Sequence, residues 1–146
     1  MRIVQADERH AEELAVLAQQ LWPHQTTEEW ASEISMLLKN DRQVFFMVMD
    51  NHKPVGFAHC SVRVDYVEGT HTTPVAYLEG IYVDRAFRGN GLAGKLLQYC
   101  ENWAKKKGCT EFASDCSLDN VSSYIFHKKM GFSEVQKIIC FTKDIS

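Results

Sequence analysis

The sequence predicts one α/β domain in which helices pack on the faces of a mixed β-sheet. Segments with apolar residues at helical spacing alternate along the chain with β-branched and aromatic runs, which excludes a helix bundle and an all-β sandwich. The chain has 146 residues, of which 45% are hydrophobic. This is the size of a single ordinary domain, so we expect one domain over residues 1–146.

The first half of the chain predicts a strand, two helices and a β-hairpin. A short apolar strand at 2–5 precedes a helix with apolar residues at helical spacing that ends near Trp22. Thr26 or Thr27, followed by Glu29, can cap a second helix that ends near Asn40. Two long antiparallel strands joined by a tight turn are then predicted from QVFFMVMD and PVGFAHCSVRVDYV.

The second half predicts a central strand followed by alternating helices and strands. The run VAYLEGIYV is long enough for a buried strand, and Gly80 inside it indicates a bulge or a close backbone approach. The remaining predicted elements are a helix at 91–107, a strand at 110–115, a helix from its N-cap Asp119 to about Met130, and two terminal strands within 131–143.

Composition excludes several classes of function. Sixteen Lys and Arg against 19 Asp and Glu give a net charge of −3, so we expect no nucleic-acid partner. Five cysteines without a CxxC pair, and histidines without ligand spacing, indicate a reducing cytoplasm and no metal. A charged N-terminus and a longest apolar run of only 44–49 predict neither a signal peptide nor a membrane span.

The loop VDRAFRGNGLAGKLL, between the central strand and the long helix, spells GxGxxG with Gly89, Gly91 and Gly94. A dinucleotide site is disfavoured because five residues separate the strand from the first glycine, and because the following chain is too short. A helix N-terminus beside Arg88 is a suitable anion site, with pyrophosphate as its natural guest. The alternative is an ordinary loop whose glycines relieve strain.

Residues 88–93, RGNGLA, resemble the Q/R-x-x-G-x-G/A signature of the GNAT superfamily of acetyl-CoA-dependent N-acetyltransferases. The segments RVDYVEGTHTTPVAYLEGIYV, CTEFASD and LDNVSSYIFH are similar to the aminoglycoside 6′-N-acetyltransferase family. The resemblance implies a mostly antiparallel sheet with splayed central strands flanked by helices. It also implies a homodimer that transfers acetyl directly from acetyl-CoA to the 6′-amine of polycationic aminoglycosides and confers resistance.

Two carboxylates are the candidate catalytic groups. An amine substrate arrives as an ammonium and must lose a proton before it attacks a thioester, so a carboxylate beside it would help. Period-2 alternation places Glu79 on the same face of its strand as Ile81 and Val83, unless it is a solvated strand-end residue. By resemblance, Asp115 would face the same amine from the other side of the cleft, although a capping or loop role would also explain it.

The resemblance also assigns the acetyl-CoA contacts. Main-chain groups of the central strand would bind the pantetheine arm, the glycine loop would bind the phosphates, and Asn120 would contact the arm or cap its helix. The implied residues are Ile81, Tyr82, Val83, Arg88, Gly89, Asn90, Gly91, Leu92, Ala93, Gly94 and Asn120.

Four further positions follow from the same resemblance. His127 stands where many GNAT enzymes carry a tyrosine that protonates the departing thiolate, and it is either that acid or a packed helix residue. Trp22 and Tyr66 match positions that line the aminoglycoside site, although simple packing also explains them. Gln136 replaces a glutamate that can contact another substrate amine in relatives, which weakens one cationic contact.

Two other functions remain open from sequence. The chain could acetylate a different amine, such as a polyamine or a protein amine. It could also be a non-catalytic module that binds acetyl-CoA.

Overall fold

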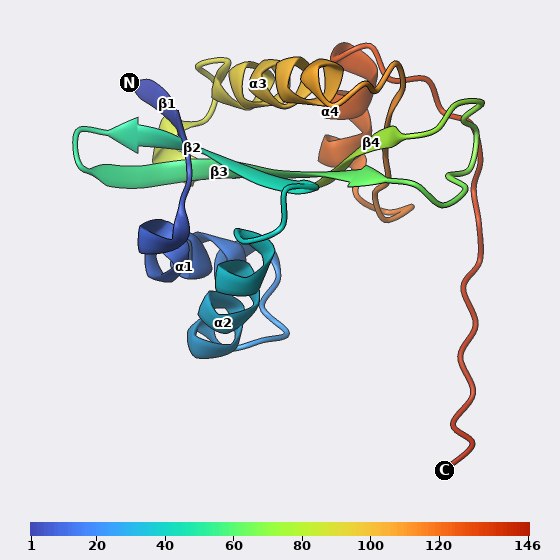
Figure 1. Cartoon of the computed structure of the whole chain (residues 1–146), viewed down its shortest axis with the longest axis horizontal. Helices are drawn as coiled ribbons and strands as arrows, with labels where there is room; N and C mark the ends of the chain where they lie inside the picture. The colour runs from blue at the N-terminus through green and yellow to red at the C-terminus, as the bar shows by residue number, and fades with distance from the viewer.

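The computed structural model describes residues 1–146 and places a five-stranded sheet between two helical layers (Figure 1). The strands are β1 (Arg2–Gln5), β2 (Gln43–Asp50), β3 (Lys53–Arg63), β4 (Val75–Val83) and β5 (Phe112–Ser114). They lie in sequence order, antiparallel except for the parallel pair β4 and β5. The predicted mixed, mostly antiparallel sheet is therefore confirmed.

Helices cover both faces of the sheet (Figure 1). One face carries α1 (Ala11–Leu21) and α2 (Thr27–Leu37), and the other carries α3 (Leu92–Lys106) with α4 (Val121–Lys129) beside it. Short 3₁₀ turns occur at Glu8–His10 and Arg85–Phe87. The N-cap of α4 is Asn120, not Asp119 as predicted, because the Asn120 side chain accepts the bond from the Ser123 amide at 3.1 Å.

The start of α2 shows how local sequence sets an element. Thr26 Oγ1 accepts from the Glu29 amide at 3.1 Å, and the Glu29 side chain accepts from the Thr26 amide at 3.1 Å. This reciprocal capping box satisfies two backbone donors that the helix itself leaves free. The bond from the Thr26 amide to the Glu29 carboxylate, followed by the interaction with the Thr26 hydroxyl, lowers the pKa of Glu29.

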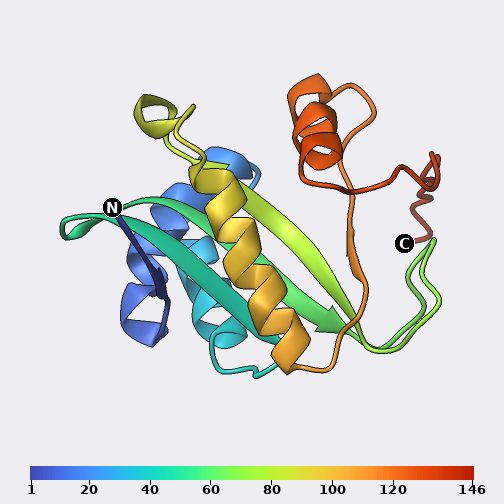
Figure 2. The same ribbon diagram turned by 90° about the horizontal axis from the view of Figure 1, so that it is seen from above.

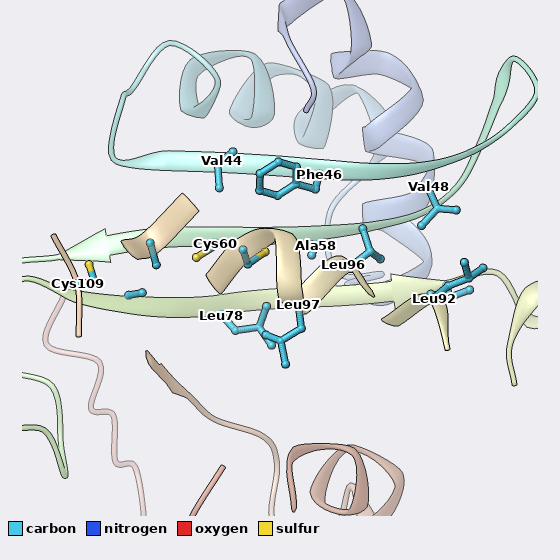
Figure 3. Close-up of a cluster of buried hydrophobic side chains, with 14 of the residues drawn as sticks. Val44, Phe46, Val48, Ala58, Cys60, Leu78, Leu92, Leu96, Leu97 and Cys109 are labelled. Carbon is cyan, nitrogen blue, oxygen red and sulfur yellow. The ribbon is translucent and has the colours of Figure 1, made fainter. Parts of the chain in front are cut away.

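Each face of the sheet has its own hydrophobic core. Figure 3 shows side chains of β2, β3 and β4 meeting Leu92, Leu96 and Leu97 of α3. The opposite core joins α1 and α2 to β2 and β3, with Leu14, Ile34 and Phe57 almost completely buried. Both cores consist of buried side chains from the sheet and its helices, so the sheet is a fixed frame for the site.

The central strand changes phase at a β-bulge. His59 pairs with Gly80 and Cys60 pairs with Leu78, which leaves Glu79 as the extra residue of β4. A Cβ atom on Gly80 would lie 2.2 Å from the indole ring of Trp22. Both predictions for Gly80, the bulge and the close approach, are confirmed.

The strands β4 and β5 separate after three residue pairs. The last parallel pair is Leu78 with Ser114, and β4 then continues to Val83 without a neighbour on that side. Figure 2 shows β4 and the segment that contains β5 diverging as the arms of a V. The splay of the central strands is confirmed.

The prediction of two terminal strands is wrong. Residues after Met130 contain no strand, and the sheet ends at β5. A strand exists only as part of a hydrogen-bonded ladder, and the apolar pattern of this segment finds no partner in its own chain. The segment instead runs away from the body in extended form (Figure 1), with Ile139 and Phe141 more than 80% exposed.

Candidate active site

An aromatic and acidic pocket lies between α2, the residues that follow α1, and the sheet. Its volume is about 240 Å³. The ring centroids of Trp22 and Trp30 lie 5.2 Å apart, and Trp30 Nε1 donates a hydrogen bond to the main-chain carbonyl of Trp22. The lining residues are Trp22, His24, Trp30, Glu33, Ile34, Leu37, Phe45, His59 and Glu79. Aromatic faces beside carboxylates suit an amine-bearing ligand.

Glu79 lies on the face of the sheet opposite to the one predicted. It lines the pocket on the α1 and α2 side, whereas Ile81 and Val83 pack into the core beneath α3. The bulge at Gly80 is the reason, since one extra residue reverses the alternation of all side chains that follow. Glu79 and the downstream half of β4 therefore face opposite sides of the sheet.

The Glu79 carboxylate is held by two residues of β3. Ser61 Oγ donates to Oε2 at 2.5 Å, and Arg63 Nη2 donates to Oε1 at 3.0 Å and to Oε2 at 2.9 Å. The Glu79 side chain is 24% exposed, so these bonds operate in a partly dehydrated setting. Charge-assisted bonds of this kind fix the direction of the carboxylate.

Asp115 accepts a hydrogen bond from the hydroxyl of Tyr77, which lies two residues before Glu79. The Arg63 guanidinium stacks over the Tyr77 ring at 3.5 Å from its centroid. Burial, followed by the bond to Asp115, raises the pKa of Tyr77, which therefore stays a neutral donor. Glu79 and Asp115 are thus joined through Arg63 and Tyr77, although Asp115 is exposed and does not line the pocket.

His59 forms the floor of the pocket as an uncharged group. Its ring stacks on Phe45 at 4.1 Å, and its Nε2–H donates to Gln43 Oε1 at 2.7 Å. Burial lowers the pKa of His59 to about 4. The imidazole therefore adds no positive charge that would repel a cationic ligand.

The glycine loop has the geometry of an anion cradle. Gly89 and Gly91 have φ angles of 84° and 73°, and a Cβ on either would meet no atom within 4 Å. Gly91 is the N-cap of α3, so the first amides of the helix have no partners within the helix. Arg88 bends back, and its Nε donates to the Val83 carbonyl at 2.6 Å. The loop and the free edge of β4 fit a phosphate-bearing ligand with an extended amide arm.

His127 lies at the fork between β4 and β5. Its Nε2 is 2.7 Å from Ser114 Oγ, and its Nδ1 is 2.7 Å from the Ser123 carbonyl. The carbonyl can only accept, so Nδ1 carries a hydrogen. Ser114 is the last residue of β5 that pairs with β4, so this dyad stands where the two strands part.

Two predicted site residues lie away from the pocket. Tyr66 is 75% exposed in the loop after β3, and Gln136 lies in the exposed C-terminal segment. Neither residue lines the pocket.

The sequence reasoning missed four residues of the site: Ser61, Arg63, Tyr77 and His59. A signal for Ser61 and Arg63 was present, because a charged residue inside VAYLEGIYV requires a partner. The polar residues Ser61 and Arg63 near the end of the preceding apolar strand are the cross-strand candidates.

The comparisons with known proteins agree with this geometry. Residues 7–132 match the model of the Acetyltransferase (GNAT) family. A relative from Acinetobacter haemolyticus, aminoglycoside N(6′)-acetyltransferase type 1, is 38% identical over 99% of both chains. The chain belongs to the GNAT acetyltransferase family, among the type 1 aminoglycoside N(6′)-acetyltransferases.

Solved structures give the same result. The 6′-N-acetyltransferase AAC(6′)-IG from Acinetobacter haemolyticus, in apo form, has a TM-score of 0.93 and 38% identity over 100% of both chains. AAC(6′)-Iy bound to the bisubstrate analogue CoA-S-monomethyl-acetylneamine has a TM-score of 0.92 and 36% identity, over 98% of this chain and 97% of that one. The whole length of the chain therefore has the fold of these enzymes.

None of the helices combines the length and the apolar character that crossing a bilayer requires. No three His, Cys, Asp or Glu side chains lie close enough together to hold a metal ion.

Proposed function

We propose that the protein acetylates the 6′-amino group of aminoglycoside antibiotics, using acetyl-CoA as co-substrate in a ternary complex, and thereby confers resistance. The observation that carries the proposal is the position of Glu79. It lies at the bulge of β4, in an aromatic pocket on one face, immediately before the strand edge that is free to receive an extended arm. The similarity to AAC(6′)-Iy, whose structure holds CoA joined to an acetylneamine, supports the same assignment.

Glu79 and Asp115 would bind the substrate ammonium. The reaction forms a bond from the amine nitrogen to the acetyl carbon and breaks the carbon–sulfur bond. The ammonium gives up two protons in total, and the departing sulfur takes up one. A carboxylate that holds the ammonium, directly or through a water, accepts the first proton before the nitrogen attacks. Trp22 would align the sugar ring that bears the amine. Tyr66 and Gln136 lie away from the pocket and stay sequence-based predictions of drug contacts.

The co-substrate would bind along the opposite side of β4. The amides of residues 88–94 at the start of α3 would hold its phosphates, and the free main chain of residues 81–83 would pair with its amide groups. Asn120, the N-cap of α4, would contact the arm from the other side of the fork. This arrangement brings the thioester to the point where β4 and β5 separate, next to Glu79.

His127 would complete the site as a proton donor to the departing sulfur. Its Nδ1–H is held by the Ser123 carbonyl and its Nε2 meets Ser114 Oγ at 2.7 Å, so the donating form is the imidazolium, which carries a hydrogen on both nitrogens. A thiolate is a stable leaving group, so we expect a modest contribution, with a larger one from the two carboxylates.

Mass spectrometry tests the proposal. A kanamycin-type drug incubated with the protein and acetyl-CoA should gain one acetyl group at its 6′ position, and a polyamine should react with a lower kcat/KM. Glu79→Gln and Asp115→Asn should each lower kcat/KM for the drug by about 100-fold or more. Glu13→Gln on the exposed side of α1 is the matched control and should retain full activity. Binding of coenzyme A without turnover of any drug would refute the proposal.

We also propose that the protein is a homodimer, with a second copy covering residues 110–146. Three features support this: β5 has a free outer edge, α4 contains no buried residue, and the segment beyond Met130 exposes Ile138, Ile139 and Phe141. Strand addition between two copies would satisfy the free backbone and bury the apolar side chains together.

Sedimentation of two matched variants tests the dimer. Ile139→Asp should shift the protein to monomer, whereas Val16→Asp, which also charges an exposed apolar position, should leave the dimer intact. A wild-type protein that sediments as a monomer at micromolar concentration would refute this arrangement.

We place the protein in the cytoplasm. All five cysteines are free, and Cys60, Cys100 and Cys109 are buried as thiols. Free buried thiols fit a reducing compartment.

A further inference from the structure

The two oxygens of Glu79 are not equivalent. Oε2 accepts three bonds, from Ser61 Oγ at 2.5 Å, from Arg63 Nε at 3.2 Å and from Arg63 Nη2 at 2.9 Å. Oε1 accepts only one, from Arg63 Nη2 at 3.0 Å. Each carboxylate oxygen offers about two acceptor sites, so Oε2 is saturated and Oε1 retains one.

Arg63 is itself held in place. It is the last residue of β3, and its guanidinium lies flat against the Tyr77 ring at 3.5 Å from the centroid. Tyr77 is buried, and its hydroxyl donates to Asp115. One ring therefore positions the guanidinium with its face and Asp115 with its hydroxyl.

The charges of this group leave room for one cation. Glu79 and Asp115 carry two negative charges and Arg63 carries one positive charge, so the group has a net charge of −1. A substrate ammonium that binds Oε1 neutralises this charge without displacing Arg63. A lysine at position 63 would supply the charge but not the planar, forked set of donors or the stacking.

We propose that Arg63 is a positioning residue for acetyl transfer: with Ser61 it clamps Oε2 of Glu79 and leaves Oε1 to receive the substrate ammonium. The proposal rests on the proposed function, because it assumes that Glu79 binds the amine. It assigns a role to Arg63, Ser61 and Tyr77. Its consequence is that loss of Arg63 affects the orientation of a bound amine more than the binding itself.

The test uses steady-state kinetics of the full-length protein with a kanamycin-type drug. Arg63→Ala should lower kcat about 10- to 100-fold and change KM by less than about threefold, because a misdirected carboxylate still attracts the ammonium. Millimolar guanidinium should restore at least a third of the lost kcat, whereas equal ammonium should not. Arg63→Lys should keep the KM but not the kcat.

Arg9 provides a matched control. It makes a similar forked contact with Asp7 through Nε and Nη2, at 3.1 and 2.7 Å, on the exposed surface. Arg9→Ala should leave both kinetic constants unchanged and should show no response to guanidinium. Thermal unfolding of each variant identifies any loss of the fold.

Three results would overturn the proposal. The first is a fall in KM of tenfold or more with unchanged kcat in Arg63→Ala, which would make Arg63 a competitor of the substrate. The second is a folded Arg63→Ala whose kcat guanidinium does not restore. The third is an Arg63→Lys variant equal to wild type, which decides the matter if Arg63→Ala does not fold. Failure of the proposed function is separate, since the wild-type protein would then not acetylate the drug at all.

Discussion

Residues 1–109 and residues 110–146 are packed very differently. Every buried residue lies at or before Cys109, and both hydrophobic cores are built from that first region. The second region contains β5, α4 and the extended segment, and it contributes only partly buried side chains such as Phe112 and Phe126. The first region thus completes the pocket and the glycine loop alone, whereas the β5 side of the fork has no buried core of its own.

The largest expected difference between the two regions is in the free energy of unfolding, which truncation of one side chain in each region tests. Leu96→Ala, in the core beneath α3, should lower the free energy of unfolding by about 3 kcal/mol, because it leaves a cavity that the neighbours cannot fill. Ile125→Ala on α4, where the side chain is 59% exposed, should cost less than about 0.5 kcal/mol. Urea unfolding at low protein concentration measures both values. Equal effects would mean that the second region is packed as tightly as the first.

Acid should weaken the first region through His59. Burial lowers the pKa of His59 to about 4 from 6.5, so between these values the unfolded chain binds a proton that the folded chain does not. The stabilising contribution is complete above about pH 6.5 and falls by about 3 kcal/mol as the pH drops to 4. Urea unfolding at a series of pH values should show this slope, and His59→Gln should flatten it. A slope that persists in the variant would assign it to other groups.

A substitution at Gly80 tests how the pocket is attached to the sheet, because Gly80 of β4 lies against Trp22 of the pocket. A methyl group on Gly80 would lie 2.2 Å from the indole, so Gly80→Ala should cost about 2 kcal/mol and shift Trp22 away from Glu79. Drug acetylation should fall together with stability. Trp22→Leu in the same chain should recover stability but not activity, and the double-mutant cycle should give a coupling above about 0.5 kcal/mol. Additive effects would indicate that the two residues are independent.

The smallest expected difference concerns the two helix caps. Thr26→Ala breaks the capping box of α2 in the first region and should lower the free energy of unfolding by about 1 kcal/mol. Asn120→Ala at α4 should lower it less, because α4 has no buried residue and can fray without opening a core. Hydrogen exchange should show the second effect only within α4. A global effect of Asn120→Ala would show that α4 unfolds together with the cores.

Sequence reasoning succeeded where the determinants are local. The capping box at Thr26 and the bulge at Gly80 follow from a few neighbouring residues, and both occur as predicted. The predicted face of Glu79 was wrong because β4 contains the bulge that was predicted at Gly80. A bulge interrupts the period-2 alternation from which the face was inferred. A bulge at Gly80 and an unbroken alternation from Glu79 to Val83 exclude each other, so only one of these two predictions could be correct.

The remaining errors concern contacts between segments that are distant in sequence, which the local sequence pattern does not specify. The segment after Met130 has a strand-like sequence, but the strand that it would join is not supplied by the same chain. Arg63 and Tyr77 were missed because their role arises only when β3 and β4 pair and bring them beside Glu79 and Asp115. Cross-strand contacts depend on register, which a single sequence specifies weakly.

The bulge at Gly80 also bears on how such an enzyme can evolve. Upstream of it, the side chains of Tyr77 and Glu79 lie on the face of the sheet opposite to α3, and downstream those of Ile81 and Val83 face α3. Under the roles proposed above, substitutions that change which drug is accepted fall on different side chains from those beside the coenzyme. The two halves of β4 can therefore change independently. New antibiotics can select substitutions before the bulge while the residues after it are conserved.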